Sequence, residues 1–257
     1  MTMTKKLFVS ITAISLLFGI AHAQRPVAIE KKMKIDGVLN ELCWYNATVF
    51  TNFIQIEPDI FKPSTTKSEL YFTYDSANIY LGGKLYQSNK TIAANNGRKD
   101  DLKTLQSDCI IIGLDPLNNG NSAYTFVINS LNAQMDGTID MVGNFDFSLD
   151  AVFISQTSIQ DDFWTFELQL PLTSINFQNK DIQTWGIMFS RRYANNQEKS
   201  INQLVDKNFP FRVSDFHKIT DVRGLSKTKN ILFTPYTYGF SPYDELKDSI
   251  AFKGKMG

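Results

Sequence analysis

The sequence predicts an all-β protein, an antiparallel β-sandwich with one short helix near its N-terminus. Three observations favour this fold class. Short runs rich in β-branched and aromatic residues follow one another, with turn signals between them. Two such runs within residues 67–87 are joined by one polar turn, as in a hairpin. Helical spacing of apolar residues is convincing only at 39–44.

The hairpin at 67–87 has the clearest pattern. Leu70, Phe72 and Tyr74 fall on one face of the first arm, which is the period-two alternation of a half-buried strand. The link Asp75-Ser76-Ala77-Asn78 fits a short connection built on a type I turn. Gly82-Gly83 in the second arm indicates a bulge or the close approach of another group.

Residues 1–23 have the pattern of a signal peptide. Lys5-Lys6 gives a basic start, residues 7–20 are mostly apolar, and Ala21-His22-Ala23 is a small-residue cleavage site. The apolar run is short and contains Ser and Thr, which disfavours an uncleaved membrane helix. We therefore expect an exported protein of the periplasm or outer membrane of a Gram-negative bacterium.

The charge composition limits the classes of binding partner to be expected. The chain has 257 residues with 26 basic and 26 acidic side chains, and removal of Lys5 and Lys6 with the leader leaves a net charge of −2. Such a balance gives no reason to expect nucleic acid as a partner. The length suits one sandwich domain with a real core. For Cys43 and Cys109 a disulfide and two buried thiols both stay open.

The helical piece and the strands follow from the same reasoning. At 39–44, Leu39, Leu42 and Cys43 share one helical face, and Trp44 fits the core better than a ligand platform. On later strands we expect Trp164 and Trp185 to face the core. We expect strands at 27–31, 50–56, 108–115, 123–130, 135–140, 151–157, 163–170 and 185–193.

Several short motifs follow one another in a defined order along the chain. They are Ile35-Asp36-Gly37 with Glu41 and Trp44, Tyr74-Asp75 with Ile79-Tyr80, Asp108 with Leu114-Asp115, Phe126 to Asn129, Trp164 with Glu167 and Pro171, and Trp185-Gly186. In this order they resemble carbohydrate-binding module family 9, a β-sandwich of the jelly-roll type. The closer likeness is to an exported bacterial branch in which that module precedes an outer-membrane β-barrel. The resemblance spans 35–225.

The resemblance implies a division of the chain. Residues 1–23 would be the signal peptide, 24–226 the sandwich, and 227–257 the start of an outer-membrane barrel domain. Because the chain stops before a barrel could form, we expect a fragment or a truncated gene product.

The resemblance also implies a sugar site, which is largely substituted. Members that bind sugar hold a terminal ring between two tryptophans, with an acid, an arginine and an asparagine at its hydroxyls. The matching positions for the first tryptophan, the acid, the arginine and the asparagine hold Leu105, Ile111, Val127 and Asn129. Only the asparagine is kept. No tryptophan lies between 207 and 217, where the rings are Phe209, Phe211 and Phe216.

Other residues are candidates for glycan or metal contacts. Arg98 lies in a turn that fits an exposed ion-paired loop and is also a candidate glycan contact. Arg191-Arg192, at a strand end, could bind an acidic glycan or a partner domain. Asn144, Asp146, Ser148 and Asp150 place oxygen ligands at alternate positions, as calcium loops do, although the glycine and distal glutamate of an EF-hand are missing. A structural calcium ion and a solvated acidic loop both remain open.

The residues give little support to catalysis. His217 is the only histidine outside the leader, so a Ser-His-Asp triad and a His/Cys zinc site are disfavoured. Paired carboxylates could serve a glycosidase, but no pair can be chosen from the sequence. The main hypothesis is an exported carbohydrate-binding module associated with polysaccharide catabolism. The alternative is a structural or docking domain for an outer-membrane barrel, and a glycoside hydrolase comes third by family association.

Overall fold

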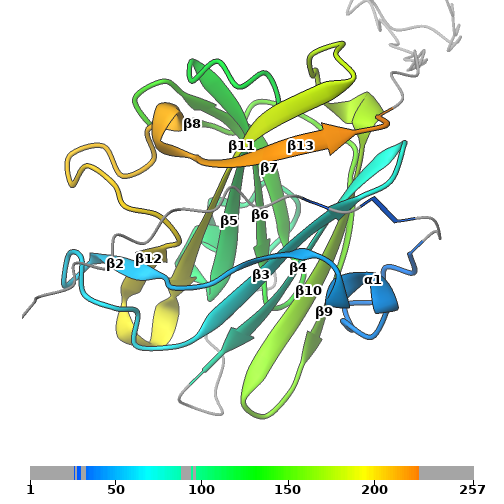
Figure 1. Cartoon of the computed structure of the whole chain (residues 1–257). Helices are drawn as coiled ribbons and strands as arrows, with labels where there is room; N and C mark the ends of the chain where they lie inside the picture. The colour runs from blue at the N-terminus through cyan, green and yellow to red at the C-terminus, as the bar shows by residue number, and fades with distance from the viewer. Residues whose placement is uncertain (1–25, 27, 30–32, 88–93, 95–96, 226–257) are drawn as a thin grey trace, which may run out of the picture.

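The computed structural model describes residues 26, 28–29, 33–87, 94 and 97–225, and these residues form two antiparallel sheets packed face to face (Figure 1). The smaller sheet has the order β1-β3-β4-β10-β9. The larger has the order β2-β12-β11-β5-β6-β7-β8, with β13 also paired to β11. The predicted β-sandwich is confirmed. The predicted segments at 1–23 and 227–257 lie outside the described residues.

The strands are β1 (Thr48–Phe50), β2 (Ile54–Glu57), β3 (Ser68–Tyr74), β4 (Asn78–Tyr86), β5 (Cys109–Asp115), β6 (Ser122–Asn129), β7 (Gln134–Asp140), β8 (Phe145–Asp146), β9 (Ile154–Ile159), β10 (Phe163–Pro171), β11 (Ile182–Tyr193), β12 (Glu198–Ile201) and β13 (His217–Arg223). The helical pieces are α1 (Leu42–Tyr45) and the short 3-10 turns η1 (Leu102–Gln106), η2 (Leu172–Ser174), η3 (Ala194–Asn196) and η4 (Val213–Asp215). None of the helices in the described ranges has the length and hydrophobicity needed to span a bilayer.

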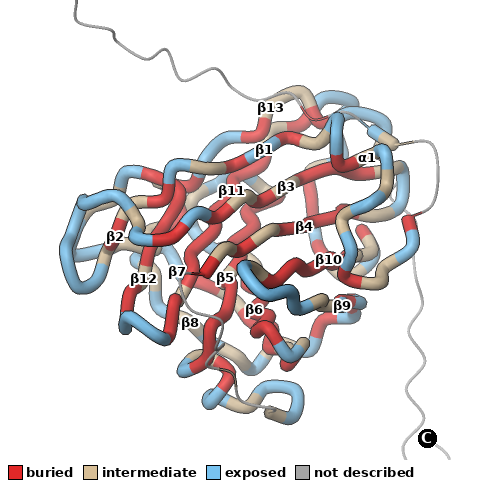
Figure 2. The backbone as a smooth tube through the Cα atoms, turned by 90° about the horizontal axis from the view of Figure 1, so that it is seen from below, coloured by how far each residue is buried: buried red, intermediate tan, exposed pale blue. Residues whose placement is uncertain are grey.

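The main core lies between the two sheets, where alternate side chains of both inner faces meet. Figure 2 shows the buried stretches concentrated on the central strands and the exposed ones on the connections. Trp164 of β10 and Trp185 of β11 are both fully buried, as predicted from the sequence. Cys43 and Cys109 are free thiols.

The hairpin at 67–87 is confirmed as β3 and β4. The strands pair from Ser68 with Leu85 to Tyr74 with Ile79, and the Asp75 carboxylate accepts the backbone N–H groups of the turn. The predicted close approach is also present, because a Cβ atom on Gly83 would lie 2.4 Å from Cε1 of Phe166. Glycine at this position therefore lets the ring of β10 pack onto β4.

Some predicted elements were wrong. The single strand expected at 50–56 is two strands, β1 in the smaller sheet and β2 in the larger one. The chain crosses between the sheets at residues 51–53, where Asn52 has a φ of 60°. The predicted helical face was wrong at Leu42, which is 82% exposed, whereas Leu39 and Cys43 pack against Trp44, whose predicted burial is confirmed. Strands β8, β12 and β13 were not predicted.

Candidate functional site

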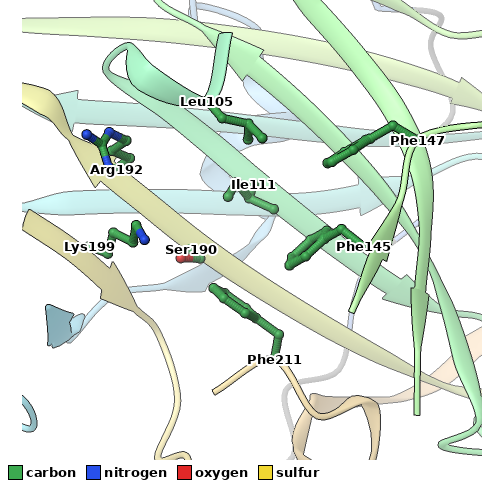
Figure 3. A pocket seen from close by; sticks show the side chains of 8 residues that line it. All are labelled: Leu105, Ile111, Phe145, Phe147, Ser190, Arg192, Lys199 and Phe211. Carbon is green, nitrogen blue, oxygen red and sulfur yellow. The ribbon is translucent and has the colours of Figure 1, made fainter. Parts of the chain in front are cut away.

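The outer face of the larger sheet, turned away from the main core, carries a pocket. Three segments cover this face: η1, the connection containing β8, and the loop between β12 and β13. They leave a pocket of about 350 Å³ with mainly apolar walls. Its lining, drawn in Figure 3, is Leu105, Ile111, Phe145, Phe147, Ser190, Arg192, Lys199 and Phe211.

Three phenylalanine rings make the aromatic wall. Phe145 and Phe147 lie nearly parallel, with ring centroids 5.9 Å apart, and Phe211 meets Phe145 edge to face at 5.1 Å. The rings come from two segments more than sixty residues apart in the sequence. Such a wall suits the apolar face of a sugar ring or another flat apolar group.

The polar side of the pocket is cationic. Arg192 of β11 pairs in register with Lys199 of β12, so both side chains leave the same face of the sheet. Lys199 Nζ lies 2.8 Å from Glu57 Oε1, which neutralises much of its charge. Arg192 donates from Nη2 to Gln197 Oε1 at 2.8 Å, while its buried Nε has no hydrogen-bond partner among the described residues.

The positions implied by the family resemblance divide into two groups. Leu105 and Ile111, at the expected tryptophan and acid, line the pocket. Val127 is fully buried beside Cys109 and Met135 in a small cluster under the pocket. Asn129 is also fully buried, so its assignment as a ligand contact is corrected.

Asn129 instead holds the turn between β6 and β7. Its Oδ1 accepts the N–H groups of Leu131 at 3.0 Å and Ala133 at 2.8 Å, and its Nδ2 donates to Ser107 Oγ at 3.3 Å. Both ends of the amide are thus engaged inside the protein.

The assignment of Arg191 as a surface ligand contact is wrong. It points into the sandwich, where it is fully buried, and its Nε and Nη2 donate to the two Asp108 carboxylate oxygens at 3.2 and 3.0 Å. Nη1 donates to the Tyr86 carbonyl of the smaller sheet at 2.7 Å. Burial raises the pKa of the Asp108 carboxyl, and attraction to Arg191 opposes that rise. The Arg191 guanidinium thus links the larger sheet to the smaller one through the Tyr86 carbonyl.

The remaining candidates lie around the pocket or away from it. Arg98 is exposed and does not line it. Of the three phenylalanines considered for the second tryptophan, only Phe211 lines it. Phe209 is 44% exposed, and Phe216 is buried under the 3-10 turn η4.

The proposed calcium loop has a different explanation. Asn144, Asp146, Ser148 and Asp150 are all exposed, while the intervening Phe145 and Phe147 face the pocket. Asn144 Nδ2 donates to Asp140, and the Asp150 carboxylate binds Lys99. The alternation is that of an extended segment with one face buried. The converging carboxylates found among the described residues do not include Asp146 or Asp150, and calcium binding stays a prediction.

The carboxylates that do converge belong to the resemblance motifs. Oxygens of Asp36, Glu41 and Glu167 lie within 4.8 Å of one another. Glu167 accepts the N–H groups of Asp36 at 2.8 Å and Gly37 at 2.9 Å and the indole N–H of Trp44 at 3.0 Å. Glu41 Oε2 is buried and finds no partner among the described atoms. Through these three hydrogen bonds Glu167 fixes the turn at Asp36-Gly37 and the Trp44 indole onto β10, so the motif has an architectural role.

This arrangement predicts a pH-dependent stability. Burial raises the pKa of Glu167 from 4.5 to about 7, against the effect of its three N–H donors. Between these pH values the native state keeps a proton that the unfolded chain loses, so the free energy of unfolding falls as pH rises and levels off above about 7. The total loss is about 3 kcal/mol at most, from 1.36 kcal/mol per pKa unit.

Urea denaturation at pH 5 and pH 8 measures the effect, with Glu167→Gln as the comparison. The variant is expected to be less stable at both pH values but to lose this part of the pH dependence. An unchanged difference between pH 5 and pH 8 in Glu167→Gln would assign the titration to another group.

Comparison with solved structures identifies the fold. No family model and no curated protein matches the chain. A carbohydrate-binding module of family 9 from Caldicellulosiruptor kristjanssonii in complex with cellotriose is similar, with a TM-score of 0.56 and 15% identity, over 82% of this chain and 99% of that one. Its complex with glucose gives a TM-score of 0.56 and 15% identity, over 80% and 100%.

A Bacteroides uniformis protein that carries a provisional carbohydrate-binding designation has the same fold, with a TM-score of 0.54 and 10% identity, over 76% of this chain and 98% of that one. The chain therefore has the β-sandwich fold of family 9 modules, as the order of its motifs predicted.

Proposed function

We propose that this protein is an exported carbohydrate-binding module that holds a glycan in the pocket on the outer face of the larger sheet. One observation carries the proposal: Leu105 and Ile111, at two positions where the family resemblance places sugar contacts, line one pocket together with Phe211. The likeness to modules solved with glucose and cellotriose supports the same ligand class. Export and a link to polysaccharide catabolism rest on the leader-like residues 1–23 and the resemblance.

The chemistry of the pocket suits a glycan chain better than a free small sugar. The phenylalanine wall offers an apolar surface, and Arg192 and Lys199 offer donors to oxygens. Three of the four polar or aromatic groups implied by the resemblance are replaced by apolar residues. Each lost charged hydrogen bond removes about 1.5–3 kcal/mol of binding energy. We therefore expect millimolar or weaker binding of free glucose and cellotriose, measurable by calorimetry with and without calcium.

The glycan proposal predicts a specific loss in Phe211→Ala. Removing one aromatic ring from the wall is expected to weaken retention on the polysaccharide that binds best by about 5- to 150-fold, taking about 1–3 kcal/mol per ring by analogy with base stacking. Affinity electrophoresis in gels containing plant and host polysaccharides measures this. Phe209→Ala is the matched control, because Phe209 belongs to the same loop but does not line the pocket.

Equal losses in the two variants would place the binding surface elsewhere. Absence of retention on every polysaccharide tested would favour the second candidate function, a structural or docking domain of an outer-membrane barrel protein. The observation that favours this alternative is the apolar replacement at Leu105, Ile111 and Val127.

A further inference from the structure

We propose that the pocket selects an acidic sugar that carries an apolar aryl or acyl group, with its carboxylate at Arg192 and its apolar group against Phe145 and Phe147. The inference rests on the proposed glycan-binding function and specifies the ligand of the same site. Cationic and aromatic side chains lie on different sides of the pocket. In Figure 3, Arg192 and Lys199 lie on one side and Phe145 and Phe147 on the other.

The charge at the pocket favours an anion. None of the lining residues is acidic. Lys199 is already paired with Glu57 at 2.8 Å, but Arg192 takes part in no ion pair with the described residues. Among the described residues its guanidinium donates to the neutral amide oxygen of Gln197. A cation at the edge of an apolar cavity with few screening partners attracts a carboxylate more strongly than one in open solvent does.

The guanidinium also has an unused donor. Arg192 Nε is buried and donates to no described atom, while Nη2 is engaged with Gln197. A buried donor without a partner is unfavourable, and a carboxylate bound at the guanidinium would compensate its charge through a charge-assisted hydrogen bond. A neutral hydroxyl could also accept this hydrogen bond, but it would leave the positive charge uncompensated.

The side of the pocket opposite Arg192 favours an apolar group of the ligand. Leu105, Ile111 and the three phenylalanine rings offer almost no hydrogen-bonding groups to a sugar's hydroxyls. A hydroxyl buried there would lose its water without gaining a partner, which is unfavourable. An aryl or acyl substituent instead gains from removal of apolar surface from water. The volume of about 350 Å³ falls within the range of small-molecule sites.

A set of four glycosides tests both features on the unaltered full chain. The probes are 2-naphthyl β-glucuronide, 2-naphthyl β-glucoside, methyl β-glucuronide and methyl β-glucoside, with affinities measured by calorimetry. We expect the naphthyl glucuronide to bind tightest, with at least about a tenfold loss on removing the carboxylate and a similar loss on removing the naphthyl group. 2-Naphthoate, added as a fifth probe, distinguishes a free aromatic acid from a sugar-borne one, because the proposal expects it to bind more weakly than the glucuronide.

Arg192→Gln supplies the matched variant. It is expected to weaken binding of the naphthyl glucuronide by at least about tenfold and that of the naphthyl glucoside much less, whereas Arg98→Gln changes neither. Equal affinity for glucuronide and glucoside in the unaltered protein would overturn the anionic part of the ligand. Equal affinity for the methyl and naphthyl glucuronides would overturn the apolar part.

The proposal and the function on which it rests fail separately. The proposed ligand, an acidic glycan with an aryl or acyl group, is overturned if none of these probes binds or if 2-naphthoate binds as tightly as the glucuronide. If the protein is still retained on polysaccharides in that case, the glycan-binding function stands. Because the comparison between probes needs no variant, a poorly folded Arg192→Gln would not prevent the test.

Discussion

Asp108→Asn is expected to lower the free energy of unfolding by about 3–5 kcal/mol, since it leaves a buried arginine without its counter-ion. Arg191 is fully buried and Asp108 is 1% exposed, so water cannot replace the lost carboxylate without opening the sandwich. The same guanidinium donates to Tyr86 O and Ser68 Oγ of the smaller sheet. Loss of the pair therefore weakens the contact between the sheets as well.

Urea denaturation of the two proteins at neutral pH gives the measurement. Asp59→Asn is the matched control, because Asp59 also pairs with a cation, Lys62 at 3.1 Å, but its side chain is 54% exposed. That variant is expected to lose less than about 1 kcal/mol. A loss below about 1 kcal/mol in Asp108→Asn as well would mean that water reaches the Arg191 guanidinium.

Removing both charges separates the penalty of an unpaired ion from the value of the pair. The double variant Asp108→Leu with Arg191→Met is expected to be more stable than Asp108→Asn, because no buried charge is left alone. The free energy of unfolding should recover only in part, because the Tyr86 carbonyl also loses its hydrogen-bond donor. A double variant less stable than Asp108→Asn would show that packing around the pair matters more than its charge.

Much of the fold could be predicted because the decisive signals are local. The hairpin depends on alternation within 68–86 and on a four-residue turn, and both are visible in one short stretch. Strands β12 and β13 were missed because their runs, Glu198–Ile201 and His217–Arg223, are short or polar. Their partners lie on other parts of the chain, so the pairing is decided by tertiary contacts.

The site was harder to predict because one-residue differences in register decide which side chains meet. Arg191 and Arg192 are neighbours in the sequence, yet one enters the sandwich core and the other lines the outer pocket. In the segment 144–150 the polar residues were considered as ligands, whereas Phe145 and Phe147 form the wall. The signal that could have found them is the aromatic half of that alternation.

Lys199 could not be placed from the sequence at all. It reaches the pocket because β12 pairs with β11 in a fixed register, with Lys199 opposite Arg192. The single position of the implied sugar site that kept its residue type, Asn129, is a structural amide inside a turn. Retention of a residue type at an implied site position therefore did not indicate a ligand contact here.

Trp164→Ala is expected to lower the free energy of unfolding by about 3–5 kcal/mol, the usual effect of truncating a large buried aromatic side chain. Trp164 is fully buried on the inner face of β10, between Leu85 of β4 and Ile159 of β9 in the sheet register. Its ring centroid lies 6.1 Å from that of Phe166, so truncation also removes an aromatic contact. The cavity left behind lies between two sheets whose hydrogen bonding resists collapse.

Chemical denaturation with Tyr45→Ala as the control checks this prediction. Tyr45 ends α1 and is 83% exposed, so its truncation is expected to change stability by no more than about 0.5 kcal/mol. The loss of unfolding free energy in Trp164→Phe should lie between the losses in Trp164→Ala and Tyr45→Ala, because the phenylalanine keeps a ring in the core. A loss below about 1 kcal/mol in Trp164→Ala would place the indole at the surface, where it could serve as a sugar platform. In that case the glycan site would have to be sought on the smaller sheet rather than in the phenylalanine pocket of the larger one.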